Sequence, residues 1–313
     1  MSESPRQAEK PARSAAEQLL ARLEWTVVRR LDGLLHGDYR TLFRGAGLDF
    51  ADLREYQLHD DIRHIDWNVT ARTQVTHVRV FTEDRDLTAW FLLDLSPSID
   101  TGSGDRDKRQ ALTEFVGVMA RLLVHHGNKV GAILFDGVNE HRIPPRAGRK
   151  QVMYLIDKIM THPRRLRAPQ TDLGAFLKRA GGALQRRSML FVVSDFVSLV
   201  GWETPLAGLN QRHEAVAVRL FDPMEQGLPD IGLLAFEDAE TGEQVFVDTT
   251  DPGFRRRFAD LAGQWEQAIV GGFMRAGVDA LELSTTDDLL DAILRFAEMR
   301  GAGIRRQRLG VVA

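Results

Sequence analysis

The chain has no cysteine among its 313 residues. Disulfide bonds, thiolate metal sites and cysteine nucleophiles are therefore excluded. The chain also lacks any apolar run of the roughly 20 residues that a membrane-spanning helix needs. Its first residues, MSESPRQAEKPARSAAEQ, lack the apolar core of a secretory signal. We therefore expect a protein of a reducing compartment, with no membrane span and a cytoplasmic location.

The chain as a whole also has no large excess of positive or negative charge, although two stretches of it do. The net charge is −3, with 43% hydrophobic and 27% charged residues, which is typical of a soluble globular protein. Residues 142–187, however, hold twelve Lys or Arg and two acids, whereas residues 221–251 hold nine acids and no Lys or Arg. These stretches are either ordinary solvated surfaces, which we favour, or a bipolar surface that docks a charged partner. Nucleic-acid binding is not favoured, because only Tyr154 and Phe176 are interleaved with the basic residues for base stacking.

The N-terminal part of the chain differs from the rest. Residues 1–14 are polar and contain two prolines, so we expect a disordered tail. From Ser14 to His36 apolar residues recur at steps of three and four, which predicts an amphipathic helix. Residues 45–86 contain glycines, a charged stretch and alternating valines at 78 and 80, which predict a small mixed unit. Residues 15–86 are therefore expected to form an N-terminal extension.

After residue 86 strands and helices alternate. Buried strands are expected at residues 87–94, 129–136, 189–195, 215–220 and 278–283, and helices at residues 107–126, 148–160, 172–186, 202–211, 254–275 and 286–300. We also expect a short edge strand at HRIPP that ends at its prolines, and a hairpin within residues 233–249. This alternation predicts an α/β fold with a doubly wound, mostly parallel sheet over residues 87–300. A basic tail, residues 301–313, follows.

Five oxygen-bearing side chains fall at three separated places: Asp94, Ser96 and Ser98 in DLSPS, Thr171 in TDLGAFL, and Asp195 in VVSDF. Right-handed crossovers bring the carboxyl ends of parallel strands to one sheet edge, where open α/β sheets bind ligands. Two carboxylates and three hydroxyls suit a hard divalent ion such as Mg²⁺ or Mn²⁺. Each residue alone is explained as an ordinary cap or turn residue. Together they predict a metal site with an open coordination position.

The same five residues resemble the metal-ion-dependent adhesion site of von Willebrand factor A domains, which has Asp-x-Ser-x-Ser, a distant Thr and a later Asp. The resemblance covers roughly residues 87–300 and implies a Rossmann-type fold. It also implies that the first Asp, both Ser and the Thr surround the ion, and that Asp195 binds it directly or through water. The open position would then accept a carboxylate from a protein partner.

Residues 45–81 resemble the characteristic segment of the bacterial "domain of unknown function 58" family, which precedes a von Willebrand factor A-like domain. The matching residues are Gly45, Gly47, Arg54, Tyr56, Asp60, Asp61, Arg63, Ile65, Asp66, Trp67, Ala71 and Arg72. Two positions depart from the pattern: His59 replaces a common Gly, and Ile99-Asp100 replaces a frequent Met. The resemblance implies an adaptor or co-chaperone that partners a MoxR-type AAA+ ATPase and is not itself an enzyme.

Three alternatives are less well supported by the residues. A phosphatase-like Mg²⁺-dependent hydrolase would use the same carboxylates, but Ser96 stands where such enzymes have the second acid of Asp-x-Asp. A second metal site in HDDIRHID, using residues His59, Asp60, Asp61, His64 and Asp66, lacks a His pair at i, i+4 spacing. The segment GSGDRDK at residues 102–108 lacks the Gly-Lys-Ser/Thr ending of a phosphate-binding loop. Asp136 is expected to serve an ordinary turn.

Overall fold

The computed structural model describes residues 14–31, 52–57, 65, 67–80, 88–165, 167–239 and 241–308. Most of the expected N-terminal tail and most of the candidate metal segment HDDIRHID lie outside these residues. The same holds for residues 32–36 at the end of the first expected helix and for the last five residues of the basic tail.

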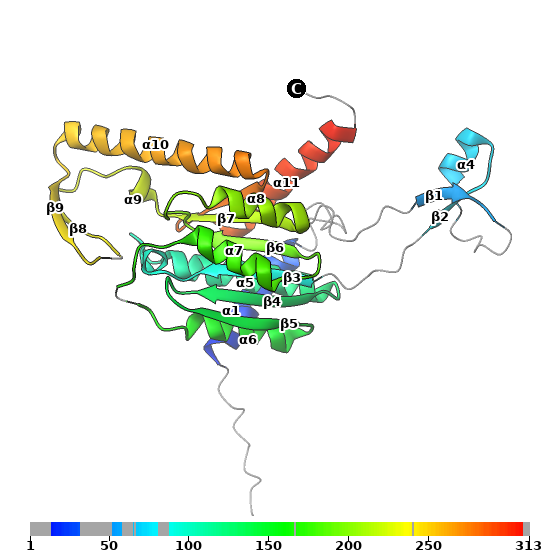
Figure 1. Ribbon diagram of the computed structural model, residues 1–313, viewed down its shortest axis with the longest axis horizontal. Coiled ribbons are helices and arrows are strands. Elements are labelled where there is room, and N and C mark those ends of the chain that lie inside the picture. Colours follow the sequence, from blue (N-terminus) through cyan, green and yellow to red (C-terminus); the bar gives the residue numbers. More distant parts are fainter. Residues whose placement is uncertain are drawn as a thin grey trace, which may run out of the picture.

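A six-stranded sheet forms the centre of the fold (Figure 1). In chain order its strands are β3 (Thr88–Asp94), β4 (Lys129–Phe135), β5 (Glu140–Arg146), β6 (Met189–Ser194), β7 (Glu214–Phe221) and β10 (Asp279–Ser284). Across the sheet the order is β10-β7-β6-β3-β4-β5, and every neighbouring pair is parallel except β4 and β5. Counted in chain order this is the 3-2-1-4-5-6 arrangement of doubly wound α/β folds. The predicted fold class is therefore confirmed.

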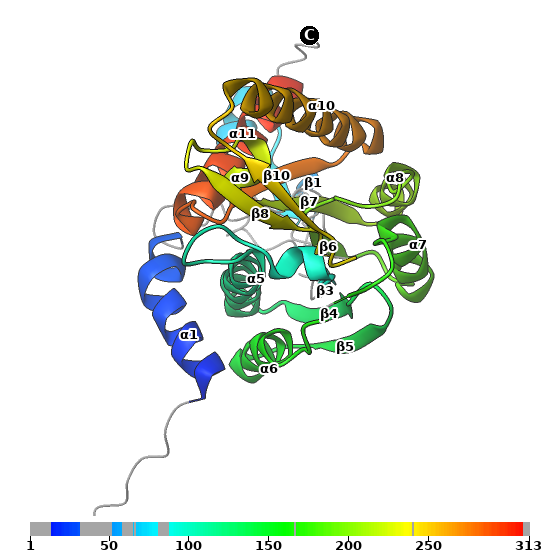
Figure 2. The same cartoon turned by 90° about the vertical axis from the view of Figure 1, so that its left-hand side faces the viewer.

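Helices cover both faces of the sheet (Figure 2). Side chains alternate between the faces along a strand, so Phe91 and Leu93 of β3 join one core cluster, whereas Trp90 and Leu92 join the other. The first cluster contains buried residues of α5 (Lys108–His125), α6 (Arg149–Met160) and α11 (Leu289–Arg308). The second contains those of α7 (Leu173–Ala183), α8 (Glu203–Arg212) and α10 (Pro252–Ala276). Burial on both faces explains why the central strands are continuous apolar runs.

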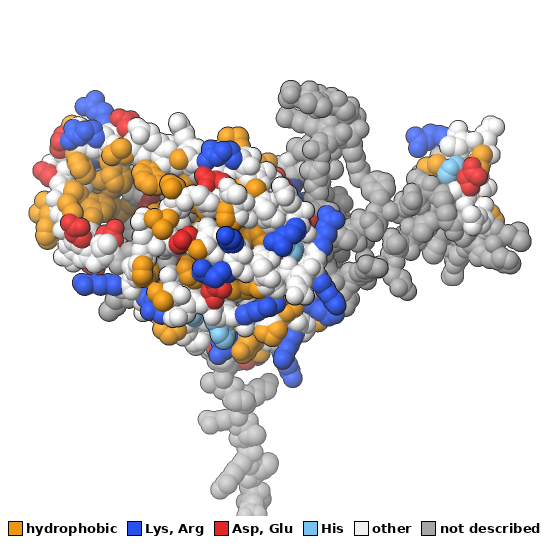
Figure 3. All heavy atoms as spheres, in the orientation of Figure 1, with side chains coloured by type: hydrophobic (Ala, Val, Ile, Leu, Met, Phe, Trp, Pro, Cys, Tyr) orange, Lys and Arg blue, Asp and Glu red, His pale blue; other side chains and the backbone are white. Residues whose placement is uncertain are grey.

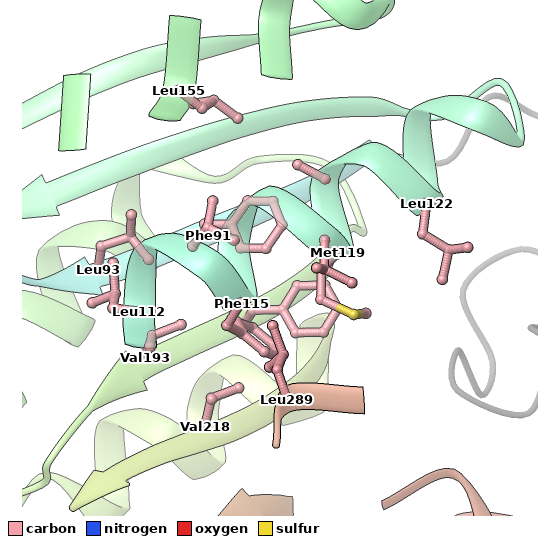
Figure 4. Packing of buried hydrophobic residues seen from close by; sticks show 14 of the residues in the cluster. Phe91, Leu93, Leu112, Phe115, Met119, Leu122, Leu155, Val193, Val218 and Leu289 are labelled. Carbon is pink, nitrogen blue, oxygen red and sulfur yellow. The ribbon is translucent and has the colours of Figure 1, made fainter. Parts of the chain in front are cut away.

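Aromatic rings lie at the centre of the first cluster (Figure 4). Phe91 of β3 stacks on Phe191 of β6 with ring centroids 5.2 Å apart, and Phe115 of α5 meets Phe191 edge-on at 5.9 Å. Leu112 and Met119 of α5 are buried in the same cluster at helical spacing from Phe115. This packing fixes α5 against the sheet, and it therefore also fixes where the first residues of α5 lie.

The N-terminal helix joins this core. α1 (Ala15–Leu23) continues into a π-helical turn, η1 (Glu24–Val28), and both pack against α5. Leu20 and Leu23 of α1 are buried in the first cluster with residues of α5 and α6. Gly117 of α5 allows the close approach, because a Cβ there would lie 3.0 Å from Leu23 Cδ1. The expected N-terminal helix therefore packs into the same core as the sheet.

Two small antiparallel units accompany the main sheet. β1 (Asp52–Glu55) pairs with β2 (His77–Val80), and α4 (Trp67–Thr73) lies between them in the chain. These elements match the small mixed unit expected between residues 45 and 86. The expected hairpin consists of β8 (Leu233–Glu237) and β9 (Gln244–Asp248).

Some elements differ from the sequence expectation. β5 continues through Pro144 and Pro145 instead of ending there. It pairs only with β4, at the edge of the sheet, where residues without an N–H are tolerated. Two short elements were not expected, the 3₁₀ turn η3 (Pro97–Asp100) and the helix α9 (Pro223–Gln226). Both contribute to the sheet edge described below.

The contact between α10 and α8 gives a test of the packing. A Cβ built on Gly272 of α10 would lie 2.5 Å from a ring atom of Trp202, which packs on Phe196 and Phe273 with centroids 5.0 and 5.4 Å away. We expect Gly272→Ala to lower the free energy of unfolding by about 1–2 kcal/mol despite the better helix propensity of alanine. Urea unfolding measures this change.

Gly263 of the same helix is the matched control, because nothing lies within 4 Å of its built Cβ. Gly263→Ala is expected to raise the free energy of unfolding by up to about 1 kcal/mol. Equal changes at the two positions would contradict the close contact with Trp202.

Candidate metal centre at the sheet edge

The carboxyl ends of β3 and β6 meet where the sheet reverses its strand order. From β3 the chain continues to β4 on one side, whereas β6 and β7 lie on the other side. Such a switch point leaves a crevice outside the strand ends, where open α/β sheets bind ligands. Asp94 ends β3, Asp195 directly follows β6, and the two strands pair up to Leu93 and Val193. Both acids therefore lie at the same edge of the sheet, as the strand pattern predicts.

Asp94 is buried among neutral hydrogen-bond donors. Its Oδ1 accepts the Ser96 N–H at 3.0 Å, and its Oδ2 accepts the Ser194 hydroxyl at 2.7 Å. Burial, together with the nearby charge of Asp195, nevertheless raises the pKa of Asp94 to about 6. At neutral pH Asp94 is therefore negatively charged at a cost in free energy, and a bound cation would reduce this cost.

The loop that follows β3 brings two hydroxyls together. The Oγ atoms of Ser96 and Ser98 lie 3.2 Å apart, with Ser96 buried and Ser98 partly exposed. Pro97 starts the 3₁₀ turn η3, and Ser96 precedes it with an extended backbone. The turn therefore brings the two serine hydroxyls together, and the Ser96 hydroxyl also hydrogen-bonds the Asp94 carboxylate.

Thr171 is buried directly before α7. The Leu199 N–H donates to its carbonyl oxygen at 3.0 Å, which holds this segment against the loop that follows Asp195. α7 is capped by Asp172, whose Oδ1 accepts the Ala175 N–H at 2.8 Å. Helix capping therefore does not account for Thr171, although its position in the sequence would allow that role.

The chain turns sharply after Asp195. Phe196 has φ +59°, a left-handed conformation that is unfavourable for a residue with a bulky side chain. Its ring is buried against Trp202 and Phe273, with centroids 5.0 and 4.7 Å away, and this packing holds the conformation. Asp195 Oδ1 accepts the Val197 N–H at 3.1 Å within the same turn. The position of Asp195 is therefore determined by its loop as well as by its strand.

Lys108, the first residue of α5, also lies at this edge, and the sequence analysis missed it. Its ammonium donates to Asp195 Oδ2 at 3.0 Å and to Glu225 Oε1 of α9 at 2.7 Å. Burial alone would lower its pKa, but the charges of the two carboxylates outweigh burial, so the pKa is raised and Lys108 stays protonated. The sequence carries no signal for this contact, because the partners lie 87 and 117 residues away.

The oxygen atoms at this edge fit a hard divalent cation. The Asp94 carboxylate accepts hydrogen bonds from the Ser96 N–H, the Ser96 hydroxyl and the Ser194 hydroxyl, which leaves part of its acceptor capacity for a cation. To a bound cation the hydroxyls of Ser96 and Ser98 would offer neutral oxygens, and Asp195 would offer a second carboxylate. The described residues contain no cluster of three or more His, Cys, Asp or Glu side chains that could hold a metal ion. A metal site at this edge would therefore need the serine and threonine hydroxyls in addition to the two carboxylates. Such a donor set suits Mg²⁺ or Mn²⁺ and is a poor match for zinc.

Two other candidates from the sequence have structural roles. Asp136 Oδ1 accepts the N–H groups of Val138 and Asn139 at 3.0 and 2.7 Å, which closes the turn after β4. In the segment of residues 102–108, the N–H and the hydroxyl of Ser103 both donate to Asp222, at 2.8 and 2.5 Å. This segment is therefore bound to the end of β7, and its Ser103 donors are engaged by a carboxylate.

Residues of the basic stretch 142–187 form ion pairs with acids that lie outside the acidic stretch 221–251. Arg165 forms an ion pair with Asp136 at 2.8 Å, and Arg179 forms one with Glu140 at 2.5 Å. Figure 3 shows Lys and Arg side chains gathered over the lower part of the main body, whereas hydrophobic side chains gather near α10. The arrangement favours ordinary solvated surfaces with local ion pairs.

None of the helices in the described ranges has the length and apolar character needed to cross a membrane.

The chain is similar to solved structures at low sequence identity. Alignment with BatB from Bacteroides thetaiotaomicron covers 69% of this chain and 99% of that chain, at 12% identity and a TM-score of 0.42. Alignment with the SpRpn10 VWA domain covers 67% and 95%, at 13% identity and a TM-score of 0.39.

Closer relatives exist among mycobacterial proteins. The uncharacterized protein Mb1516 of Mycobacterium bovis is 35% identical over 284 residues, which cover 91% of this chain and 89% of that protein. The uncharacterized protein Rv1480 of Mycobacterium tuberculosis gives the same values. The family described as "Protein of unknown function DUF58" matches residues 52–268. The chain therefore belongs to the DUF58 family, as its sequence motifs predict.

Proposed function

We propose that this chain is a protein-interaction module that binds its partner through a divalent cation, Mg²⁺ or Mn²⁺. Asp94, Ser96, Ser98, Thr171 and Asp195 would hold the cation, and an acidic side chain of the partner would complete its coordination. The observation that carries the proposal is the burial of Asp94 beside Asp195, which raises the pKa of Asp94 to about 6. A cation bound between the strand ends offsets this unfavourable charge.

A binding role agrees better with these residues than hydrolysis does. Hydrolysis at a cation would need a general acid or base in addition to the residues that hold the ion. Ser96 occupies the place of the second acid in Asp-x-Asp, and Asp195 is already paired with Lys108 at 3.0 Å. We therefore expect no phosphatase activity from the cation-loaded protein.

The proposed partner is a MoxR-type AAA+ ATPase. This part of the proposal rests on the resemblance of the sequence to adaptors of that class. The charge of the cation supports the acidic nature of the contacting residue, because an open coordination position favours a carboxylate of the partner over a neutral side chain.

Partner capture tests this function. The chain is immobilised and exposed to a purified MoxR-type ATPase with MgCl₂ or with EDTA. We expect retention in MgCl₂, loss in EDTA, and a decrease of about tenfold or more for Thr171→Val, which removes a hydroxyl from a buried position. Thr171→Ser keeps the hydroxyl and should retain the ATPase. Equal retention with EDTA and with MgCl₂ would overturn the proposal.

A further inference from the structure

Lys108 is placed where a lysine is electrostatically unfavourable. It is the first residue of α5, directly after the N-cap Asp107, and only 2% of its side chain is exposed. The N-terminus of a helix carries a partial positive charge, so a cation there is destabilised. A buried ammonium in this position persists only if nearby carboxylates compensate for its burial.

Asp195 and Glu225 supply this compensation from two different elements. Lys108 Nζ lies 3.0 Å from Asp195 Oδ2 and 2.7 Å from Glu225 Oε1. Asp195 is therefore paired with a positive charge, whereas Asp94 is held by a backbone N–H and a hydroxyl, which are neutral. Of the two carboxylates proposed to hold the cation, Asp195 is therefore neutralised by an ion pair, and Asp94 is not.

Glu225 is itself fixed in position by α9. The Asp222 N–H donates to Glu225 Oε2 at 3.2 Å, which completes the capping box of this short helix. The Asp222 carboxylate in turn accepts the hydroxyl of Thr285 at 2.8 Å and the N–H of Ser103 at 2.8 Å. The ammonium of Lys108 is therefore held between two anchored carboxylates.

We infer that Lys108 sets the affinity of the site for its divalent cation. Without a bound cation, Lys108 neutralises Asp195 and keeps the two acids compatible with burial. A cation that binds must share Asp195 with the ammonium, so the lysine weakens cation binding. This inference rests on the proposed function, because it concerns the same site.

Two substitutions with opposite expected effects test the inference. Lys108→Met removes one positive charge that contacts Asp195, and the dissociation constant for Mn²⁺ is expected to fall by about tenfold or more. Glu225→Gln removes a negative charge from the other side of Lys108, keeps a residue suited to the capping box, and is expected to raise the dissociation constant by about threefold. Isothermal titration with Mn²⁺ measures both values on the full chain.

Thermal unfolding provides a second readout. Without metal, Lys108→Met should unfold at a lower temperature than the wild type, because Asp195 loses its partner. Added Mn²⁺ should raise the unfolding temperature of this variant by more than it raises that of the wild type. Where Lys108→Met does not fold, Lys108→Gln, which removes the charge but keeps an N–H donor for Asp195, carries the same expectation for Mn²⁺ binding.

The outcomes separate the inference from the proposed function. If the wild type binds Mn²⁺ and Lys108→Met binds it equally or more weakly, the inference is overturned while the proposed function stands. If Mn²⁺ binds only to Lys108→Met, the lysine controls access even more strongly than expected, and the proposed function is overturned for the wild type. If neither protein binds Mn²⁺, both are overturned.

Discussion

Replacing Asp94 with asparagine is expected to raise the dissociation constant for Mn²⁺ by about 100-fold or more, because the variant loses the carboxylate at the end of β3. The same substitution is expected to stabilise the cation-free protein at pH 7. The pKa of Asp94 is about 6 against an ordinary value of 3.8, so its buried charge costs up to about 3 kcal/mol. Asparagine can still accept the Ser96 N–H, but it loses the charged acceptor of the Ser194 hydroxyl, which costs about 1 kcal/mol.

The net gain in the free energy of unfolding is therefore about 2 kcal/mol. Isothermal titration and urea unfolding measure the two effects. Asp172→Asn is the matched control, because Asp172 is an exposed acid next to Thr171, and asparagine caps a helix as well as aspartate does. This control should change neither value. Undiminished Mn²⁺ binding by Asp94→Asn would remove Asp94 from the site.

Lowering the pH is expected to weaken cation binding. Asp94 must be deprotonated to hold a cation, and its pKa is about 6 because it is buried beside Asp195. The dissociation constant for Mn²⁺ should therefore rise by about tenfold between pH 7 and pH 5. Titrations across this range in a non-coordinating buffer measure the effect. A dissociation constant that does not change until pH 4 would contradict the raised pKa of Asp94.

The stability of the cation-free protein should depend on pH through the same group. The pKa of Asp94 is higher in the folded state than the ordinary 3.8, so the folded state binds more protons at intermediate pH. The stabilisation from protonated Asp94 is complete below about pH 4 and is lost as the pH rises through about 6. Relative to Asp94→Asn, the wild type should lose up to about 3 kcal/mol over this range. A difference that is independent of pH would contradict this expectation.

Local patterns predicted most of the secondary structure. β3 shows a continuous apolar run because it is a central strand of the sheet and is buried on both faces. α5 shows a clear helical periodicity because one face of it is buried against that sheet. The prediction was wrong at HRIPP, where edge pairing lets β5 pass through Pro144 and Pro145. It also missed α9, because a helix of four residues has too few turns to show a periodicity.

The packing partners of α1 were harder to predict than the helix itself. The apolar residues of α1 show that one face of the helix is buried, but not what covers it. Leu20 and Leu23 pack with α5 and α6 in the first cluster, so the helix belongs with the sheet despite the intervening segment. Contacts between distant segments of this kind depend on the packed structure and leave no local pattern.

The sequence by itself determined the fold class and the family, and it predicts the five oxygen-bearing residues of the candidate metal centre, because strand ends and motif spacing are local properties of the chain. Only the tertiary structure decided the charge of that centre. It brought Lys108 from the start of α5 and Glu225 from α9 to Asp195, and it buried Asp94 beside them. The physical reason is that burial and Coulomb interactions depend on distance in space, which residues far apart in the chain acquire only when the sheet and its helices pack together.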